Sequence, residues 1–527
     1  MTRLQEFLDR MIPRIVDLHK LSNDAYWKAT TTGDPADEER YAALKADLLK
    51  LFADRDAYAQ LRELRESGQI TDPLLARQLE ILYYSYAEQQ IDAEDIEELV
   101  RRETEIEGRF TSYRALIDGE KVSDNEIYDI LGSETSSEKR RAAWEASKQI
   151  GVEVAHNVIE LVKFRNGIAA KLGYSNYYEM SLAFQEIDRT ELFDVLGQLE
   201  VATRAPFAAM KAELDGELAA RCGIDVSEMR PWHYADPFFQ EAPASEGVDL
   251  NKYFADQDVV ALSKVYFDGV GLEIQDILNR SDLYEREGKN QHAYCTDIDR
   301  EGDVRILCNV RANEYWMATM LHELGHAVYD QEFDANLPWL LRGPAHTLTT
   351  EAIAMLFGRL TKDADWLTKI AGVPPEEAQA VSSEVARQLT RSMLIFVRWG
   401  LVMTYFERDM YENPDRDLNT LWWDYVEKFQ MVKRPEGRTA PDWAAKIHLG
   451  TAPVYYQNYI LGELCASQFL AAMERDLNLT SVTEEPRVGQ WLTEKVFLPG
   501  ARYSWNEMIR NATGQELTPE FFVKQFV

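Results

Sequence analysis

The ten residues Leu321–Asp330, LHELGHAVYD, place two histidines, a glutamate and a glycine in a run that otherwise favours a helix. In an α-helix, residues four positions apart lie on the same face, so the side chains of His322 and His326 point in the same direction. Glu323 lies about 100° further round the helix. Because the chain has only eight histidines in 527 residues, a chance occurrence of this spacing has a probability on the order of one per cent. The stretch therefore indicates a functional helix rather than simple core packing.

Two imidazoles on one helix face can bind the same ion, and a carboxylate beside them can reach a water held by that ion. This H-E-x-x-H spacing predicts a zinc-hydrolase site, with His322 and His326 as metal ligands and Glu323 as the general base. A catalytic zinc also needs a third protein ligand and an open position for water. The remaining ligand must come from elsewhere in the chain.

The third ligand is expected shortly after the histidine helix. A metzincin would need glycine at position 329 and histidine at 332, where this chain has Tyr329 and Glu332, so that class is excluded. Glu332 is itself a poor ligand, since it points roughly 120° away from the edge that carries His326. The segment TEAIAMLFGRL predicts a second helix on which Glu351 can face the first helix across the ion. His346, in the loop before that helix, is the alternative donor.

The composition is that of an ordinary globular protein, with 46% hydrophobic and 28% charged residues. A net charge of −33 excludes nucleic acid and anionic membrane surfaces as favoured partners, because both would be repelled at long range. No apolar signal core opens the sequence, and no run approaches the roughly 18 apolar residues of a membrane helix. We therefore expect a cytoplasmic protein. The four cysteines lack metal-site spacing and are expected to be free thiols.

Apolar residues recur at three- and four-residue intervals from residue 1 to about 220, which predicts amphipathic helices. Breaks rich in Gly, Pro and Asp separate them, as in TTTGDPADEE at 30–39, and the aromatic stretch 223–247 is expected to be a packed connection. KNQHAYCTDID and DVRILCNV, separated by REG, predict a β-hairpin before the histidine helix, for which Asn313 is the expected N-cap. The expected fold is predominantly α with a small β-sheet next to the HExxH helix. A pure α-solenoid is the competing architecture.

The motif MLHELGH, with 24 residues between His326 and Glu351, resembles the gluzincin peptidases of the angiotensin-converting enzyme (peptidyl-dipeptidase A) family and the related thimet oligopeptidase/oligoendopeptidase F family. The likeness to the first family runs from roughly residue 230 to 470 and includes DVRILCN, LPWLLRG and EAIA. It implies a single peptidase unit, 1–527, with an N-terminal helical half including a lid, 1–230, and a zinc-binding catalytic half, 231–527. The two halves would flank a deep channel that admits only short unstructured peptides.

The resemblance also implies substrate contacts before the motif. In QHAYC, His292 matches a histidine that bonds the peptide carbonyl just past the scissile bond, and Ala293 matches an alanine on the substrate-pairing strand. Two positions depart from the converting-enzyme pattern. Met355 replaces a carboxylate that orients a zinc histidine, which leaves Asp330 as a candidate for that role. Asn458 replaces the arginine of chloride-activated members, so little chloride dependence is expected.

A second segment, KIHLGTAPVYYQNY, resembles the part of the family that binds the substrate carboxylate and the oxyanion. Lys446 and His448 match in spacing, Lys446 as the clamp for the terminal carboxylate and His448 as an assisting oxyanion donor. Tyr456 and Tyr459 match the family's tyrosine pair if one residue is inserted, and Tyr455 is a rival for either role. Tyr459 would share the oxyanion with the zinc ion. Core packing is the alternative explanation for this aromatic cluster.

Together these residues predict a zinc-dependent peptidase with one zinc ion per chain, acting on short peptides as a peptidyl-dipeptidase. An oligoendopeptidase of the thimet/oligopeptidase F type is the first alternative, because those enzymes cut internal bonds with a similar tyrosine cluster. A catalytically silent zinc- or peptide-binding protein on the same scaffold is the second. The intact Glu323 argues against the silent protein, since a structural site has no use for a base beside the metal.

Overall fold

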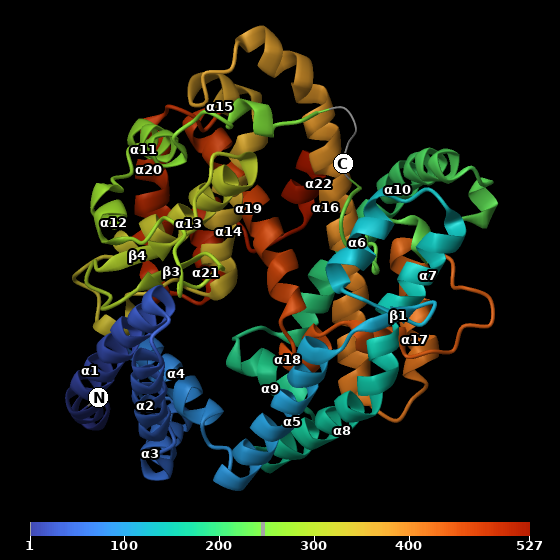
Figure 1. Cartoon of the computed structure of the whole chain (residues 1–527). Coiled ribbons are helices and arrows are strands. Elements are labelled where there is room, and N and C mark those ends of the chain that lie inside the picture. The colour runs from blue at the N-terminus through green and yellow to red at the C-terminus, as the bar shows by residue number, and fades with distance from the viewer. Residues whose placement is uncertain (1, 244–247) are drawn as a thin grey trace. The chain divides into compact units, whose positions relative to one another are not determined.

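The computed structural model describes residues 2–243 and 248–527, and helices make up most of it (Figure 1). Within the described residues, strands occur only as two separate two-stranded sheets. The prediction of a predominantly α fold is therefore confirmed, and the sheets distinguish it from a pure α-solenoid. None of the helices in the described ranges has an apolar stretch long enough to cross a membrane.

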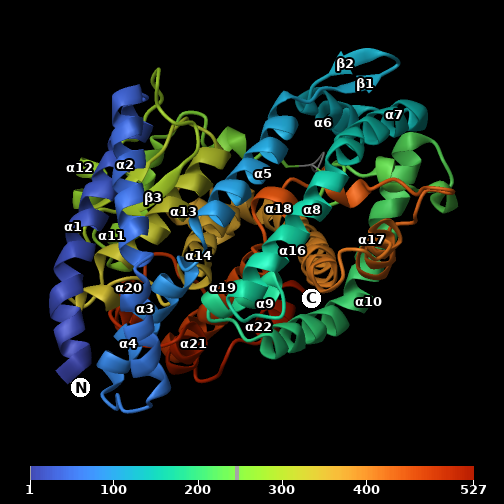
Figure 2. The same cartoon turned by 90° about the horizontal axis from the view of Figure 1, so that it is seen from below.

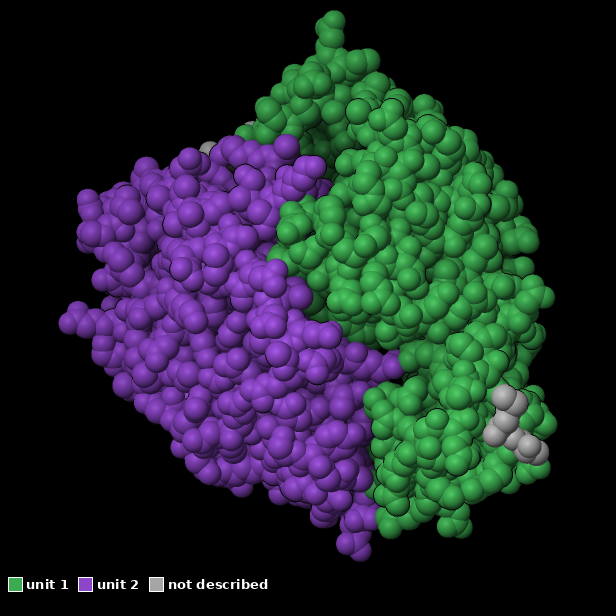
Figure 3. Space-filling view, turned by 180° about the vertical axis from the view of Figure 1, so that it is seen from behind, with its two compact units in different colours: residues 1–90, 248–385, 461–521 green, residues 91–247, 386–460, 522–527 purple. Residues whose placement is uncertain are grey.

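The chain forms two compact units, each built from separate segments (Figure 3). Unit 1 comprises residues 1–90, 248–385 and 461–521, and unit 2 comprises residues 91–247, 386–460 and 522–527. Each unit thus combines segments from both sides of residue 230, because compact packing joins segments that are distant in the sequence.

Unit 1 begins with four helices that end at the Gly/Pro/Asp breaks: α1 (Thr2–Thr32), α2 (Pro35–Phe52), α3 (Arg55–Glu66) and α4 (Pro73–Glu88). An aspartate side chain accepts a backbone N–H at the start of α2, α3 and α4, and proline is the first residue of α2 and α4. Helices α1 and α2 lie side by side (Figure 2). Their apolar faces and those of α3 and α4 contribute to one core, which includes Leu4, Phe7, Leu61 and Tyr86.

The remaining α-helices and strands that lie wholly in unit 1 include α13 (Glu314–Gln331), which is the HExxH helix, and its neighbours α11 (Val259–Val270), β3 (Tyr294–Asp297), β4 (Val304–Leu307) and α14 (Thr347–Gly358). The others are α12 (Gln275–Arg280), α15 (Ala364–Lys369), α20 (Pro486–Leu492) and α21 (Trp505–Thr513). Three helices contain a boundary between the units, so that each begins in one unit and ends in the other: α16 (Pro375–Glu412), α19 (Tyr456–Leu477) and α22 (Glu520–Phe526). The four cysteines of the chain are free, as predicted.

The hairpin predicted before the HExxH helix is present and packs against it. Strand β3 pairs antiparallel with β4, from Tyr294 opposite Leu307 to Asp297 opposite Val304. The side chain of Asn313 accepts a hydrogen bond from the backbone N–H of Trp316 at 2.9 Å and so caps α13 as expected. Local sequence signals therefore predicted the surroundings of the histidine helix correctly.

Unit 2 is also mainly helical. Its elements are α5 (Ala93–Ser112), β1 (Ala115–Ile117), β2 (Glu120–Val122), α6 (Asp124–Ser133), α7 (Ser137–Ser147), α8 (Gln149–Lys171), α9 (Tyr177–Phe184), α10 (Arg189–Cys222), α17 (Leu418–Tyr425) and α18 (His448–Thr451). The β1–β2 hairpin was missed by the sequence prediction. Its turn residues Asp118 and Gly119 have φ of 53° and 86°, and an Asp-Gly pair is a known hairpin signal.

The stretch 223–247 was expected to be a packed connection. In its described part, 223–243, the side chains of Trp232, His233 and Tyr234 are buried. Arg140 of α7 donates hydrogen bonds to the backbone oxygens of Trp232 and Tyr234, which ties the connection to unit 2. The prediction is confirmed for these residues, and positions 244–247 lie outside the described part of the chain.

Candidate metal centre and active site

Helices α13 and α14 approach each other closely at Gly325, the glycine of the HELGH motif. A Cβ atom at this position would lie 2.8 Å from the Cα of Ala354 and 3.1 Å from the ring of Phe357. Any larger side chain would therefore push α14 away from α13. The glycine thus brings Glu351, one turn before Ala354 on α14, toward the histidines of α13.

The side chains of His322, His326 and Glu351 form one cluster, in which one donor atom from each residue lies within 4.8 Å of the others. The Oε2 atom of Glu351 is 3.7 Å from Nε2 of His322 and 3.8 Å from Nε2 of His326. These separations are too long for direct hydrogen bonds. They resemble the roughly 3.3–3.6 Å between ligand atoms of a tetrahedral zinc site with bonds of about 2.0–2.2 Å. The donor set and its spacing fit a zinc ion.

Both histidines of the cluster favour the neutral form that binds metal ions. Burial lowers the pKa of His322 to about 4. Burial, together with the nearby His322, lowers the pKa of His326 to about 3. At neutral pH the imidazoles are therefore uncharged and have a lone pair available for an ion.

Thr350, the residue before Glu351, orients one of these histidines. Its Oγ1 lies 2.7 Å from Nδ1 of His326. When Nε2 of His326 faces an ion, Nδ1 carries the proton and donates a hydrogen bond to this hydroxyl. The expected partner, Asp330, lies instead beside the Sγ of Cys295 at 4.0 Å, so that expectation is wrong. Helix packing places the turn that carries Glu351 next to the ring of His326.

His346, the alternative metal donor, occupies the N-cap of α14. Its Nδ1 accepts a hydrogen bond from the backbone N–H of Leu348 at 3.0 Å. In the described ranges, the only group of three or more His, Cys, Asp or Glu residues with metal-ligand spacing contains Glu351 and not His346. The geometry thus gives His346 a role in starting the helix.

Glu323 lies beside the cluster and lines a cavity of about 520 Å³ together with His322, His326 and Glu351. Its side chain is buried, and burial, with a further contribution from the charge of Glu351, raises its pKa to about 8. A carboxyl group with a pKa near neutrality can both accept and release a proton. Residues from the β3 side, including Ala293 and Cys295, line the same cavity.

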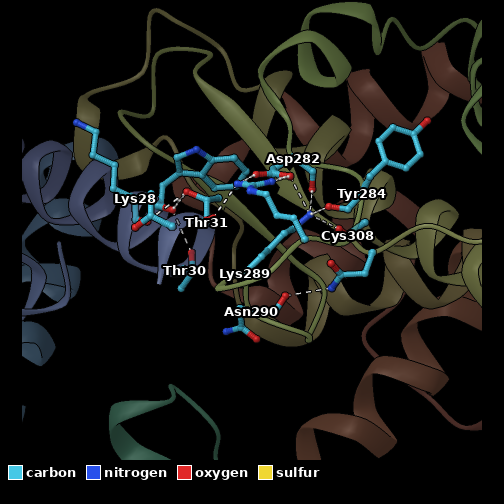
Figure 4. Close-up of polar contacts among 12 residues, drawn as sticks. Lys28, Thr30, Thr31, Asp282, Tyr284, Lys289, Asn290 and Cys308 are labelled. Atoms are coloured by element: carbon cyan, nitrogen blue, oxygen red, sulfur yellow. Dashed lines mark hydrogen bonds and ion pairs between the residues drawn. The ribbon is translucent and has the colours of Figure 1, made fainter. Parts of the chain in front are cut away.

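The loop before β3 is held by the buried ammonium group of Lys289 (Figure 4). This group donates to the backbone oxygen and carboxylate of Asp282, at 2.9 and 2.8 Å, and also to the backbone oxygens of Tyr284 and Cys308. The backbone N–H of Asn290 donates to the oxygen of Thr30 in α1 at 2.9 Å. These contacts tie the loop to both α1 and the end of β4.

The two substrate-contact candidates of this loop differ in their surroundings. Ala293 lines the metal cavity but lies immediately before β3, which begins at Tyr294, so its predicted place on the strand is wrong by one residue. His292 is exposed and is not among the residues that line the cavity. Its backbone N–H donates to the side chain of Asn290 at 2.9 Å.

The other predicted substrate residues gather in unit 2. The ring of Tyr456 lies 5.2 Å from that of His448 and 5.5 Å from that of Tyr459, and the rings of Tyr455 and Tyr459 lie 5.1 Å apart. The ammonium of Lys446 lies 5.7 Å from the centre of the Tyr456 ring. The structure therefore brings together all five residues that the sequence placed in this segment.

Polar contacts define the electrostatics of this second cluster. The hydroxyl of Tyr456 accepts a hydrogen bond from Nε1 of Trp399 at 3.1 Å, and burial raises its pKa to about 12. Burial lowers the pKa of Lys446 to about 8. Burial, followed by the positive charge of Lys446, lowers the pKa of His448 to about 4. At neutral pH the histidine is uncharged and the lysine is largely charged.

The family model of peptidase family M3 matches residues 130–527. The chain is also 25% identical over 259 residues to carboxypeptidase 1 of Bacillus subtilis, covering 44% of this chain and 51% of that protein. It is 23% identical over 255 residues to the angiotensin-converting enzyme-related protein of Drosophila melanogaster, covering 45% of this chain and 40% of that protein. A match to angiotensin-converting enzyme of Mesocricetus auratus is 24% identical over 238 residues, 43% of this chain and 18% of that enzyme.

These relatives confirm the resemblance to gluzincin metallopeptidases of the converting-enzyme type. The alignments cover about half or less of the length of each of these curated relatives. The family model, in contrast, covers most of the chain and contains the HExxH helix, Glu351 and the tyrosine segment. The chain therefore belongs to peptidase family M3.

Proposed function

We propose that this protein is a zinc-dependent peptidase that binds one zinc ion through His322, His326 and Glu351. The observation that carries the proposal is the cluster of three donor atoms within 4.8 Å, beside the buried Glu323 in one cavity. Two neutral imidazoles and one carboxylate are the ligand set of hydrolytic zinc sites with an open position. Membership of peptidase family M3 supports short peptides as the substrates.

A zinc ion held by His322, His326 and Glu351 would supply Lewis acidity toward a water and the substrate carbonyl. Glu323 takes a proton from the attacking water and passes it to the leaving amine. The family resemblance assigns Tyr459 and His448 to the carbonyl oxygen, where a hydrogen-bond donor stabilises the developing negative charge. It assigns His292 and Ala293 to the substrate backbone.

The surroundings of His448 support its role as a donor. Its Nδ1 is buried and has no hydrogen-bond partner among the described residues. A proton on Nδ1 would be a buried donor without an acceptor, which is unfavourable by about 1–3 kcal/mol. The neutral ring therefore favours the tautomer with its proton on Nε2, and this N–H is the one available to an oxygen of the substrate.

We further propose that the enzyme is a peptidyl-dipeptidase, with Lys446 binding the terminal carboxylate and Tyr456 or Tyr455 beside it. Lys446 is half-buried, and its ammonium donates to the neutral amide of Gln240 at 2.7 Å. No carboxylate in the described part of the chain forms an ion pair with it. Its charge is thus available for a substrate carboxylate.

Amidating the carboxyl end of a good substrate should lower kcat/KM by about 10- to 150-fold, because a charged hydrogen bond contributes about 1.5–3 kcal/mol. The Lys446→Ala variant should cleave both forms equally well. Lys428→Ala is the matched control, because Lys428 also lies over an aromatic ring, 4.8 Å from the centre of Phe429, but is exposed. The penalty should shrink as the pH rises above about 8, where Lys446 loses its charge.

Product analysis by mass spectrometry accompanies these rates. Release of carboxyl-terminal dipeptides supports the proposal. Equal cleavage of the free and amidated peptides, with products from internal bonds, would instead identify an oligoendopeptidase of the thimet/oligopeptidase F type. Binding of zinc and peptide without any cleavage would identify the catalytically silent alternative.

Replacing Thr350 by valine should lower zinc affinity by about 10- to 100-fold, because His326 loses the partner that holds its ring. Valine preserves the shape of the side chain but lacks the hydroxyl. Thr349→Val is the matched control, since Thr349 lies on the same turn and donates to the backbone oxygen of His346 at 2.7 Å. Competition with a chelator measures both affinities. Equal affinities in the two variants would show that Thr350 does not orient a ligand.

A further inference from the structure

Val454 stands directly before Tyr455 and Tyr456 in a backbone conformation that L-residues rarely adopt. Its φ is +53°, and a β-branched residue in the left-handed region is a genuine outlier. Such a conformation persists only where the surroundings enforce it. The residue is fully buried, so the enforcing groups must come from the protein interior.

Side chains hold both polar groups of Val454. On one side, its backbone N–H donates to Oε1 of Glu407 in α16 at 2.8 Å. On the other, its backbone oxygen accepts from Nε2 of Gln457 at 2.6 Å and from Nε2 of Gln185 at 3.1 Å. Glu407 and Gln457 are buried, and Gln185 caps the end of α9. The residue is thus held in place by α9, α16 and the start of α19.

The side-chain amide of Gln185 also contacts the first turn of α19. The Oε1 atom of Gln185 accepts from the side chain of Asn458 at 2.8 Å and from that of Gln457 at 3.2 Å. On the preceding part of the chain, the backbone oxygen of Gly450 accepts from the buried guanidinium of Arg165 at 2.7 Å. All of these residues belong to unit 2. The segment from His448 to Tyr459 is therefore held at three successive points.

We propose that Glu407 and Gln185 are positioning residues, which keep Val454 in its left-handed conformation and thereby set the directions of Tyr455, Tyr456 and Tyr459. This inference rests on the proposed function, which gives those tyrosines their roles toward the substrate. Without the contacts to Glu407 and Gln185, Val454 relaxes to a negative φ, and the peptide group between Val454 and Tyr455 rotates. A displacement of about 1 Å in a positioned group can lower turnover by about 100-fold.

The test is a double-mutant cycle. One substitution removes the hydrogen bond between Glu407 and Val454, and the other removes the backbone strain at Val454. Glu407→Leu removes the acceptor of the Val454 N–H and should lower kcat by about 10- to 100-fold. Val454→Gly should have little effect alone, because glycine adopts positive φ without strain. Combined with Glu407→Leu, it should recover most of the lost kcat. Simple additivity of the two substitutions would overturn the proposal.

The conservative variant Glu407→Gln should retain near wild-type kcat, because its side-chain oxygen still accepts from Val454. Burial raises the pKa of Glu407 to about 8, so the native group is largely a neutral acid at pH 7, which glutamine resembles. Thr404→Val is the matched control: it removes a buried hydrogen bond, Thr404 to the oxygen of Gly400 at 2.9 Å, one turn away on the same helix. A loss of kcat in this control equal to that in Glu407→Leu would show a general structural effect and overturn the proposal.

A spectroscopic readout separates this inference from the proposed function. The indole N–H of Trp399 donates to the hydroxyl of Tyr456 at 3.1 Å, so its NMR resonance reports the position of that tyrosine. The resonance should shift in Glu407→Leu and return in the double variant. If the wild-type protein cleaves no peptide, the proposed function fails, and this resonance still decides the inference.

If Glu407→Leu does not fold, Glu407→Asp replaces it in the cycle, because the shorter side chain withdraws the carboxylate from the N–H of Val454. An unchanged Trp399 resonance and unchanged kcat in a folded variant that lacks the contact would overturn the positioning role. A shift that Val454→Gly reverses would support it.

Discussion

Replacing Glu323 by glutamine is expected to lower kcat by roughly 10²–10⁴-fold or more while the protein keeps its zinc ion. Glutamine has nearly the same shape but cannot accept a proton from water. Glu323 is buried beside the cluster of His322, His326 and Glu351 and lines the same cavity. The substitution therefore removes the base and leaves the three donor atoms in place.

Two measurements on one preparation check this result: zinc stoichiometry by atomic absorption and turnover of a short peptide. Glu332→Gln is the matched control, because Glu332 caps the end of the same helix and is not one of the three clustered donors. It should retain both zinc and activity. Near wild-type turnover in Glu323→Gln would contradict the assignment of Glu323 as the general base.

Replacing Glu351 by alanine is expected to lower zinc affinity by more than the 10- to 100-fold expected for losing an outer partner such as Thr350, because it removes one of three ligands. The Glu351 oxygen lies 3.7 and 3.8 Å from the two imidazole nitrogens, and in the described part of the chain no other His, Cys, Asp or Glu completes a three-residue group with this spacing. Chelator competition gives the affinity. Retention of tight zinc binding would contradict the ligand assignment.

The matched substitution His346→Ala should leave zinc affinity nearly unchanged and lower the stability of the protein instead. His346 caps α14 through its Nδ1, and loss of an N-cap lowers stability by about 1 kcal/mol. The expected result is a lower Tm with full zinc occupancy. Loss of zinc with His346→Ala, and not with Glu351→Ala, would reverse the two roles.

Local rules account for the parts that the sequence predicted well. The spacing of His322 and His326 places both imidazoles on one helix face, whatever the rest of the chain does, because the helical repeat is set by the backbone. Asn313 caps α13 and the β3–β4 hairpin forms because cap and strand signals act over a few residues. The β1–β2 hairpin had an equally local signal in its Asp-Gly turn and could have been predicted from it.

Partners across helices were not predictable in this way. Thr350 rather than Asp330 contacts His326, because the close approach at Gly325 decides which turn of α14 faces the ring. Asp330 is four residues from His326 along the chain and Thr350 is 24 residues away, and the sequence carries no information on that packing. Met355 stands where the converting-enzyme pattern has a carboxylate that orients a zinc histidine. Only the packing of α13 against α14 identified Thr350 as the partner of His326.

By itself, the sequence determined the family and the helical class of the fold, and it predicted the residues of the proposed metal centre from the spacing of His322 and His326 on one helix and of Glu351 on the next. Only the tertiary structure decided how the chain divides into two interleaved units and which side chains orient the functional groups. The left-handed conformation of Val454, held by Glu407 from α16 and Gln185 from α9, is one example. The physical reason is that such contacts join residues 24 to 269 positions apart, and their geometry follows from the packing of whole helices.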